Sequence, residues 1–391
     1  MIGLGEQKQL KVLAPAAAVP KISRRALLGG FAVVGASLAL TGCGRGKSFA
    51  ASALPNGVLG SQLNVYSWGD YEDPDDISAF QDESGVRVQL DSFSSNEELI
   101  AKLAATRGTS GYDIVVPTGL YIPQMAANGL LQKLDHSKLP NMSNLDPTYT
   151  NQVWDRGNQY TVPKAWGTTG YVYDTTVIKG ELTSWQDFLT AATTVASGKT
   201  AVLEDSWEVV AIYLGAKGID MNTEDTKALD AAEDYLVNTL AKNIRAFNSN
   251  VVTSGIPQGT FALMQSFNGD ARQGMLSASD PERWKFVFPT PTANLWMDNW
   301  ALATGAQHPD AAYAFINHMM TPEVALHEVD YIGYHTGVKD LKEAALAEDM
   351  ELPDLVFPPQ KVLDRLTAGV LNNGQERRVQ ILNKMESRAG A

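Results

Sequence analysis

The sequence predicts an α/β protein that contains two α/β units. Three observations support this prediction: the chain has 391 residues, strand and helix signals alternate from residue 63 onward, and a second alternating run begins near residue 184. A chain of this length is long enough for two domains. Alternating strands and helices are typical of parallel sheets whose strands are joined by right-handed crossovers.

The first unit is predicted to alternate strands and helices over residues 63–68, 73–85, 86–90, 94–107 and 112–117. Its first helix has an acidic first turn and is followed by Gly85, a helix-ending signal. Ser95 and Glu98 form a capping-box pattern at the start of its second helix. The three strands are therefore expected to lie parallel, with their carboxyl ends at one edge of the sheet.

The second unit is predicted to open with a helix over 184–196 and a strand, turn and helix over 200–218. A helix over 226–243, strands over 283–291 and 293–304, and helices over 308–320 and 321–331 follow. The glycine-rich segment 167–171 (GTTGY) lacks the lysine of a phosphate-binding loop. We interpret this segment as a hinge between the two units.

Charge excludes one class of partner. The net charge is −13, which argues against nucleic acid as a ligand. Residues 1–43 hold five basic side chains and one acidic one, a net of +4, so residues 44–391 carry −17. The mature protein is therefore expected to be strongly acidic.

The N-terminus has the layout of a secretory signal. Ser23, Arg24 and Arg25 begin a twin-arginine-like (Tat) pattern, and the apolar run 26–40 is shorter than the roughly 20 residues of a membrane span. The run ends at Cys43, the single cysteine, in a sequence that resembles a bacterial lipobox. We interpret Cys43 as a lipidation site, the alternative being a buried free thiol. Residues 44–60 are interpreted as a flexible tether.

Several kinds of chemistry lack sequence support. The histidines show no spacing typical of a zinc site; they are His136, His308, His318, His327 and His335. No phosphate-binding glycine loop and no GxSxG nucleophile elbow is present. No metal and no cofactor is therefore expected.

Aromatic and acidic residues recur instead at strand ends and turns. Trp68, Tyr71 and Thr118 follow predicted strands, where ligands of parallel sheets bind. Trp296 and Asp298 share one face of a strand because they are two residues apart. The same residue types recur at Asp205, Glu208, Phe267, Asp270, Trp300 and Tyr334. Taken singly, a strand Trp is usually a core residue and an Asp before a helix is usually a cap.

Long segments of the chain resemble the spermidine/putrescine-binding proteins of bacterial ABC importers. The resemblance extends from about Leu63 to Val338. Its motifs are YSWGDY (66–71), SNEELIAKL (95–103), YDIVVPTGLYIPQ (112–124), VPKAWGTTG (162–170), LEDSWEVV (203–210), SFNGDA (266–271), LWMDNWALA (295–303) and IGYHTG (332–337). They occur in the order expected of that family.

The resemblance implies a two-lobe periplasmic-binding-protein-like fold of type II, with a ligand cleft between lobes that close about a hinge. The expected divisions are 1–43 for the signal peptide, 44–60 for the tether, 61–166 with 298–349 for lobe 1, and 167–297 with 350–391 for lobe 2. It also implies that aromatic faces line a polyamine's carbon chain while carboxylates receive its ammonium groups. The implied ligand-binding residues are Trp68, Tyr71, Thr118, Asp205, Glu208, Phe267, Asp270, Trp296, Asp298 and Tyr334.

The resemblance further implies a non-catalytic receptor that delivers a polyamine to an ABC transporter permease. As a lipoprotein it would be extracytoplasmic, anchored to the outer face of the cytoplasmic membrane or periplasmic, and it is expected to be a monomer. The alternatives are another amine, an amino acid, an opine-like compound or ferric iron on the same scaffold, or a glycosidase that uses Asp205 and Glu208. An amino-acid ligand would require an arginine, for which Arg272 is the candidate.

Some positions depart from the family pattern, and they leave the choice between putrescine, spermidine and another cation open. Leu120 stands where many relatives carry Tyr, and the neighbouring Tyr121 is expected to point elsewhere. Phe267 replaces a usual Trp, and Trp207 replaces a common Arg. Gln375 is a candidate for the family's C-terminal Gln.

Overall fold

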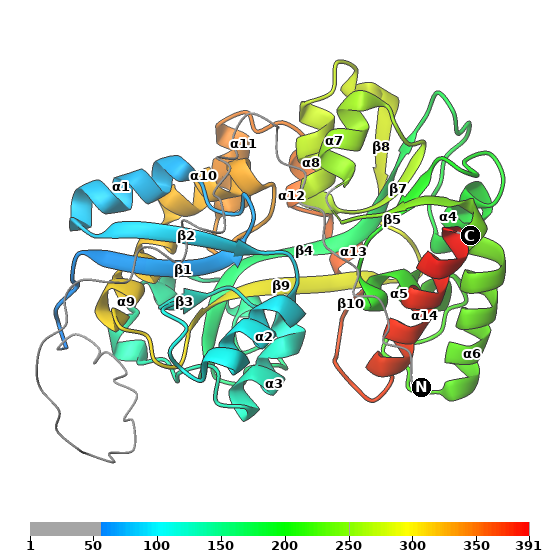
Figure 1. Ribbon diagram of the computed structural model, residues 1–391. Helices are drawn as coiled ribbons and strands as arrows, with labels where there is room; N and C mark the ends of the chain where they lie inside the picture. Colours follow the sequence, from blue (N-terminus) through cyan, green and yellow to red (C-terminus); the bar gives the residue numbers. More distant parts are fainter. Residues whose placement is uncertain (1–55, 250, 391) are drawn as a thin grey trace, which may run out of the picture. The chain divides into compact units, whose positions relative to one another are not determined.

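A computed structural model describes residues 56–249 and 251–390. Its strands are β1 (Gln62–Trp68), β2 (Arg87–Phe93), β3 (Ile114–Val115), β4 (Thr161–Asp174), β5 (Thr200–Val202), β6 (Ile244–Phe247), β7 (Leu263–Phe267), β8 (Trp284–Val287), β9 (Ala293–Leu302) and β10 (Leu366–Ala368). The first three strands alternate with helices as predicted (Figure 1). The described range does not include Cys43 and most of the tether.

The helices of the first unit are α1 (Pro74–Ser84), α2 (Asn96–Thr106) and α3 (Ile122–Ala127). Those of the middle of the chain are α4 (Trp185–Ala192), α5 (Ser206–Ala216), α6 (Thr226–Tyr235), α7 (Val251–Gln258) and α8 (Asn268–Leu276). The rest are α9 (Pro309–Met319), α10 (Pro322–Ile332), α11 (Leu341–Ala347), α12 (Pro353–Val356), α13 (Gln360–Leu363) and α14 (Gln375–Ala389). Among these described helices, none combines the length and the hydropathy that a membrane span requires.

The strands form one sheet in the order β2-β1-β3-β9-β4-β7-β5-β6, with β10 beside β9 and β8 beside β4. As predicted, β1 is parallel to both β2 and β3. On the other side of the sheet, β5 is parallel to β6 and β7. The long strands β4 and β9 are antiparallel and lie side by side between these two parallel parts (Figure 1).

The described hydrophobic side chains form four core clusters, two of which are much larger than the others. One contains Leu63, Phe80 and Phe315, and therefore joins β1 to helices α1 and α9. The other contains Trp185 and Phe188 of α4 together with residues of α5, α6 and α14. The smaller clusters contain Leu99 and Val115 in one case and Val172 and Met264 in the other. Separate clusters are the expected consequence of two lobes that share long crossing strands. The predicted α/β two-lobe fold class is confirmed.

The segment interpreted as a hinge lies inside β4. This strand pairs with β9 up to Thr168 and with β7 from Thr169 onward, so its neighbour changes within the glycine-rich segment. A side chain at Gly170 would come within 2.2 Å of the Val287 carbonyl oxygen, which explains the need for glycine there. Movement about this point stays a prediction.

Local signals explain most helix ends. Asp73 caps α1 by accepting from the Asp75 amide, and Gly85 ends it with φ 70°. The predicted capping box of α2 is only half formed. Ser95 accepts from the Glu98 amide, but the Glu98 carboxylate accepts from Ser94 instead of Ser95. The second lobe's helix predicted over 226–243 keeps α geometry only to Tyr235 and continues as a π-helical turn.

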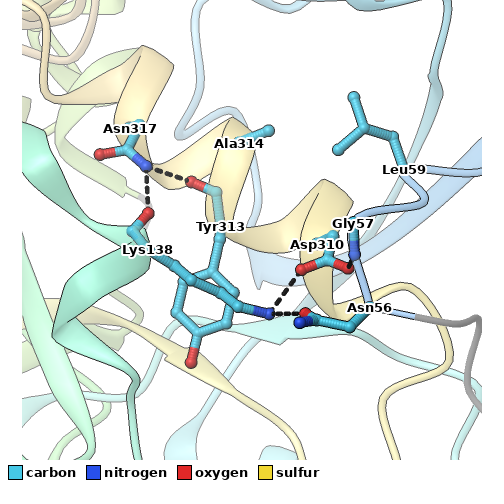
Figure 2. Close-up of a pocket in the computed structure, with 8 residues that line it drawn as sticks. All are labelled: Asn56, Gly57, Leu59, Lys138, Asp310, Tyr313, Ala314 and Asn317. Carbon is cyan, nitrogen blue, oxygen red and sulfur yellow. Dashed lines mark hydrogen bonds and ion pairs between the residues drawn. The ribbon is translucent and has the colours of Figure 1, made fainter.

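The last residues of the expected tether contact the first lobe. Asp310 on α9 accepts from the Gly57 amide, and Lys138 contacts both Asp310 and Asn56 (Figure 2). Leu59 packs against the first-lobe core. These residues border a surface pocket of about 390 Å³. Residues 56, 57 and 59 therefore contact the folded lobe, and the tether boundary at residue 60 stays a prediction.

Val356 and Phe357 follow the predicted start of lobe 2 at residue 350, and they are buried in the same cluster as Leu63. The divisions between the lobes stay predictions.

Candidate ligand-binding site

Strand β9 presents three candidate site side chains at alternate positions. Asn294, Trp296 and Asp298 share one face because successive strand residues point to opposite faces. Trp296 pairs with Gly167 of β4, and Asp298 pairs with Ala165. All three side chains are buried. The predicted pairing of an indole and a carboxylate on one strand face is therefore present.

Asp298 is held by two hydroxyl groups from the first lobe. Thr118 Oγ1 donates to Asp298 Oδ1 at 2.6 Å, and the Tyr71 hydroxyl donates to Oδ2 at 3.0 Å. Burial raises the pKa of Asp298 to about 6, while these hydrogen bonds and the charge of Lys164 oppose the shift. The structure thus brings together Tyr71, Thr118 and Asp298, three of the residues that the family resemblance implies for the ligand site.

Aromatic rings connect Asp298 to a second carboxylate, that of Asp270. The Tyr334 ring lies 4.8 Å from the Trp296 ring, edge to face, and the Phe267 ring lies 5.4 Å from Trp296. The Tyr334 hydroxyl donates to Asp270 Oδ1 at 2.6 Å. Burial raises the pKa of Asp270 to about 6 although the side chain keeps some solvent exposure.

Two further carboxylates, those of Asp205 and Glu208, lie at the start of α5. Asp205 caps this helix by accepting from the amides of Trp207 and Glu208. The Glu208 carboxylate accepts from Thr169 of β4 at 2.8 Å and from Asn294 of β9 at 2.6 Å. Burial, and then the charge of Asp205, raise the pKa of Glu208 to about 8. Asp205 therefore caps α5, as expected of an Asp that precedes a helix, and also forms an acidic pair with Glu208.

Asn294 links Glu208 to the β9 face that carries Asp298. Four residues of a strand span about 13 Å. The Glu208 carboxylate therefore lies at the Asn294 end of this stretch of β9, Asp298 lies at the other end, and Trp296 lies between them.

Trp68 is less closely connected to this group. Its ring packs 4.6 Å from Phe93, and its Nε1 donates to the Val116 carbonyl oxygen. Trp68 remains half-buried at the end of β1, at the sheet edge predicted for ligands. Trp207, by contrast, is a core residue of the second lobe and is 3% exposed.

The structure also describes the surroundings of Tyr121 and Arg272, two residues close in sequence to proposed site residues. The Tyr121 side chain is buried, and its hydroxyl donates to Glu97 at 2.7 Å; that it does not line the ligand's carbon chain stays a prediction. Arg272, the candidate for binding a ligand carboxylate, is 1% exposed. Its guanidinium donates to Asp330 Oδ1 at 2.6 Å and to the Glu351 carbonyl oxygen, and is fully engaged in joining α8 to other elements.

The four site carboxylates share one electrostatic property. Within residues 56–249 and 251–390, their hydrogen bonds come from hydroxyl, amide and backbone N–H groups, and none comes from Lys or Arg. Buried anions without a cation are costly, which explains the raised pKa values. A ligand with two positive charges would supply the missing counter-charges.

Sequence reasoning missed several polar residues of the site. Thr169 and Asn294 hold Glu208. Thr169 lies in the motif 162–170 and Asn294 in the predicted strand 293–304, but neither carries a charge that would have singled it out. Lys164 is also in a quoted motif, and its charge in the middle of an apolar strand was an available signal. Gln375 donates to Ser206 at 3.1 Å, and its Oε1 is buried without a partner in the described part of the chain.

Gly167 offers a test of the packing around Trp296. An added Cβ would lie 2.4 Å from the Trp296 ring and 2.6 Å from Asn268 Oδ1. Gly167→Ala is expected to lower the free energy of unfolding by about 1–3 kcal/mol, because overpacking forces neighbouring side chains out of position. Gly69→Ala is the matched control, since no atom lies within 4 Å of its added Cβ. Equal unfolding midpoints for the two variants in urea would contradict the packing argument.

Comparisons with known proteins agree with the site's composition. The family model described as bacterial extracellular solute-binding protein matches residues 77–354. Spermidine/putrescine-binding periplasmic protein 1 of Haemophilus influenzae is 31% identical over 325 residues, which cover 83% of this chain and 88% of that protein. A putrescine-binding periplasmic protein of Escherichia coli is 32% identical over 336 residues, or 81% and 89% of the two chains.

A solved structure shows the same fold. It is the spermidine/putrescine ABC transporter substrate-binding protein of Streptococcus pneumoniae, with a TM-score of 0.72 and 30% sequence identity. The match covers 84% of this chain and all of the other.

Proposed function

This chain belongs to the family of bacterial extracellular solute-binding proteins, and from that premise we propose that it captures a polyamine and delivers it to an ABC transporter permease. Proteins of this family bind solutes outside the cytoplasm and are not enzymes. The observation that carries the proposal is the set of four poorly neutralised carboxylates around an aromatic wall. Related proteins named for spermidine and putrescine support the choice of ligand.

The two ends of the site suit the two ends of a polyamine. One ammonium group would be received by Asp298 and Asp270, and another by Asp205 and Glu208. The Trp296 and Tyr334 rings would cover the carbon chain between them. A cation–π contact contributes about 0.5–2 kcal/mol. A charged hydrogen bond contributes about 1.5–3 kcal/mol. After the cost of association is subtracted, three or four such contacts give a free energy of binding of about −8 kcal/mol, which corresponds to a micromolar Kd.

A neutralising ligand also explains lobe closure. Without a cation, the four carboxylates disfavour a closed site because they are buried or partly buried and repel one another. A bound diammonium ligand removes both penalties in the closed form only, and therefore shifts the population toward closure. The buried and unpartnered Oε1 of Gln375 is a further acceptor, and it supports Gln375 as the residue that contacts an amine near Asp205.

Two further properties belong to the proposal. The Arg24-Arg25 pattern, the apolar run and Cys43 support export by the twin-arginine route and a lipid anchor. A monomer suits a receptor that presents a single two-lobe ligand site to a permease.

A titration calorimetry panel tests the function. The mature protein is expected to bind putrescine or spermidine with a micromolar or lower Kd, and to show no heat with glutamate, because Arg272 is not free to hold a carboxylate. Arginine tests the alternative of an amino-acid ligand with a cationic side chain, since it carries a guanidinium group as well as a carboxylate. Tight binding of glutamate without any polyamine binding would refute the proposal.

A further inference from the structure

A buried ion cluster lies against Tyr71, the residue whose hydroxyl donates to Asp298. Its cation is Lys164 of β4, and its anions are Glu72 and Glu328; these residues are 2%, 6% and 1% exposed. The Lys164 Nζ donates to Glu328 Oε2 at 3.0 Å and lies 3.8 Å from Glu72 Oε1. Buried charges of this kind are expensive to desolvate, so the cluster needs a reason beyond stability.

The backbone directs Lys164 to this place. The pairing of β4 with β9 shifts register between Pro163 and Ala165, which leaves Lys164 as the extra residue of a β-bulge. A bulge re-aims one side chain relative to the regular alternation of a strand. The bulge lies beside Ala165, the residue that pairs with Asp298.

The cluster binds three consecutive residues of the loop between β1 and α1. Lys164 Nζ donates to the Tyr71 carbonyl oxygen at 2.6 Å and approaches the Glu72 carboxylate. Glu328 Oε1 accepts from the Asp73 amide at 2.6 Å. The Glu72 carboxylate is held in turn by Ser67 Oγ of β1 at 2.6 Å. The loop that carries Tyr71 is thus clamped at every residue from 71 to 73.

Lys164 also contacts the Tyr71 side chain itself. Its Nζ lies 4.1 Å from the centre of the Tyr71 ring and 5.0 Å from that of the Trp300 ring. The ammonium therefore fixes Tyr71 through both its carbonyl oxygen and its ring face. The far end of the same ring, the hydroxyl, donates to Asp298.

We propose that Lys164 is a positioning residue for ligand binding: with Glu328 it holds Tyr71 so that the Tyr71 hydroxyl orients Asp298 toward the ligand's ammonium group. The inference rests on the proposed function for its ligand. Lys164 does not touch the ligand in this scheme. Its charge is paired with that of Glu328, and its proposed effect on the ligand is exerted through Tyr71.

A charge-balanced double variant tests this role. Lys164→Met with Glu328→Gln removes one positive and one negative charge, keeps similar volumes, and leaves an acceptor for the Asp73 amide. Its Kd for putrescine and spermidine is expected to rise about tenfold or more, because residues in contact couple to this extent. The matched control is Arg283→Met with Asp174→Asn, an ion pair at the other end of β4, which is expected to leave the Kd unchanged.

A double-mutant cycle separates positioning from general destabilisation. Tyr71→Phe is expected to weaken binding several-fold in the wild-type background and by less than about threefold in the Lys164→Met/Glu328→Gln background, because Tyr71 is no longer held. Equal losses in both backgrounds, or a double variant that binds like the wild type, would overturn the proposal. If the double variant does not fold, Lys164→Arg replaces it in the same cycle, since it keeps the charge but substitutes a planar group for the ammonium.

The double-mutant cycle can also be measured through the stability of the unliganded protein. In urea unfolding of the unliganded protein, the midpoint shift caused by Tyr71→Phe is expected to shrink when Lys164 and Glu328 are replaced, because the hydroxyl's bond to Asp298 is already loosened. Additive midpoint shifts would overturn the positioning role. If the wild type binds no polyamine, the proposed function fails, while this unliganded cycle still tests Lys164.

Discussion

Replacing Asp298 with Asn is expected to weaken polyamine binding by about 30- to 1,000-fold. Removing one member of a buried charge pair costs about 2–4 kcal/mol, because the other charge is then left buried without its counter-ion. Asp298 meets this condition: it is 6% exposed, and the two groups that bond to it, Thr118 and Tyr71, are neutral. The ligand's ammonium group is its proposed partner.

The same substitution is expected to leave the unliganded protein at least as stable as the wild type at neutral pH. The raised pKa of Asp298 shows that its charge is unfavourable in the folded, unliganded protein. Asn keeps one oxygen acceptor and the shape of the side chain. Calorimetry gives the affinity and thermal unfolding gives the stability. Asp82→Asn, a substitution of an exposed residue on α1, serves as the control. Unchanged affinity in Asp298→Asn would place the ligand elsewhere.

The sequence was sufficient to predict the face of β9 and its first-lobe partners. Trp296 and Asp298 share a face because of strand periodicity, which is a local property. Tyr71 and Thr118 come together because parallel strands deliver their carboxyl ends to one edge of a sheet. Hydrophobic periodicity and capping signals likewise predicted β1, β2, α1 and α2, with boundaries shifted by a few residues.

The strand that joins the lobes was harder to predict. All fourteen residues of β4 are buried, so its sequence shows no alternation of apolar and polar residues. Its glycines also resemble a loop, although Gly167 and Gly170 are required by close neighbours from β9 and from Val287. A strand buried on both faces can be recognised only when its partners are known.

The polar residues that hold the site carboxylates and Tyr71 could not be predicted, because they contact residues far away in the sequence. Asn294 holds Glu208 from a position 86 residues away in the chain. Lys164 and Glu328 are 164 residues apart. Arg272 was singled out because it lies near Asp270 in the sequence, yet its partners are on other elements. Neighbourhood along the chain is a poor guide to the partners of long polar side chains.

Polyamine affinity is expected to fall at least about 100-fold between pH 8 and pH 5. Asp270 and Asp298 have pKa values raised to about 6, and Glu208 to about 8, chiefly by burial. Alkyl ammonium groups titrate near pH 10, so the ligand's charge does not change in this range. At pH 5 each group with a pKa of 6 must first lose a proton, a penalty of about tenfold per group. Glu208, whose pKa is about 8, must also lose a proton at pH 5 and therefore lowers the affinity further.

The stability of the protein is expected to respond with the opposite sign. These carboxyls have folded-state pKa values above their unfolded values of about 4, so the folded, unliganded protein binds more protons than the unfolded chain. Their contribution to stability is complete below pH 4 and is lost as the pH rises through 6 to 8. A bound diammonium ligand restores it, because the ionised carboxylates are then paired.

The increase in Tm caused by saturating putrescine or spermidine is therefore expected to be larger at pH 8 than at pH 5. Calorimetry at pH 6 in two buffers of different ionisation enthalpy is expected to show release of protons on binding. Asp270→Asn with Asp298→Asn should reduce both the number of protons released and the pH dependence of the remaining affinity. A Kd that is constant from pH 5 to pH 8 would mean that the buried carboxylates do not receive the ligand's charge.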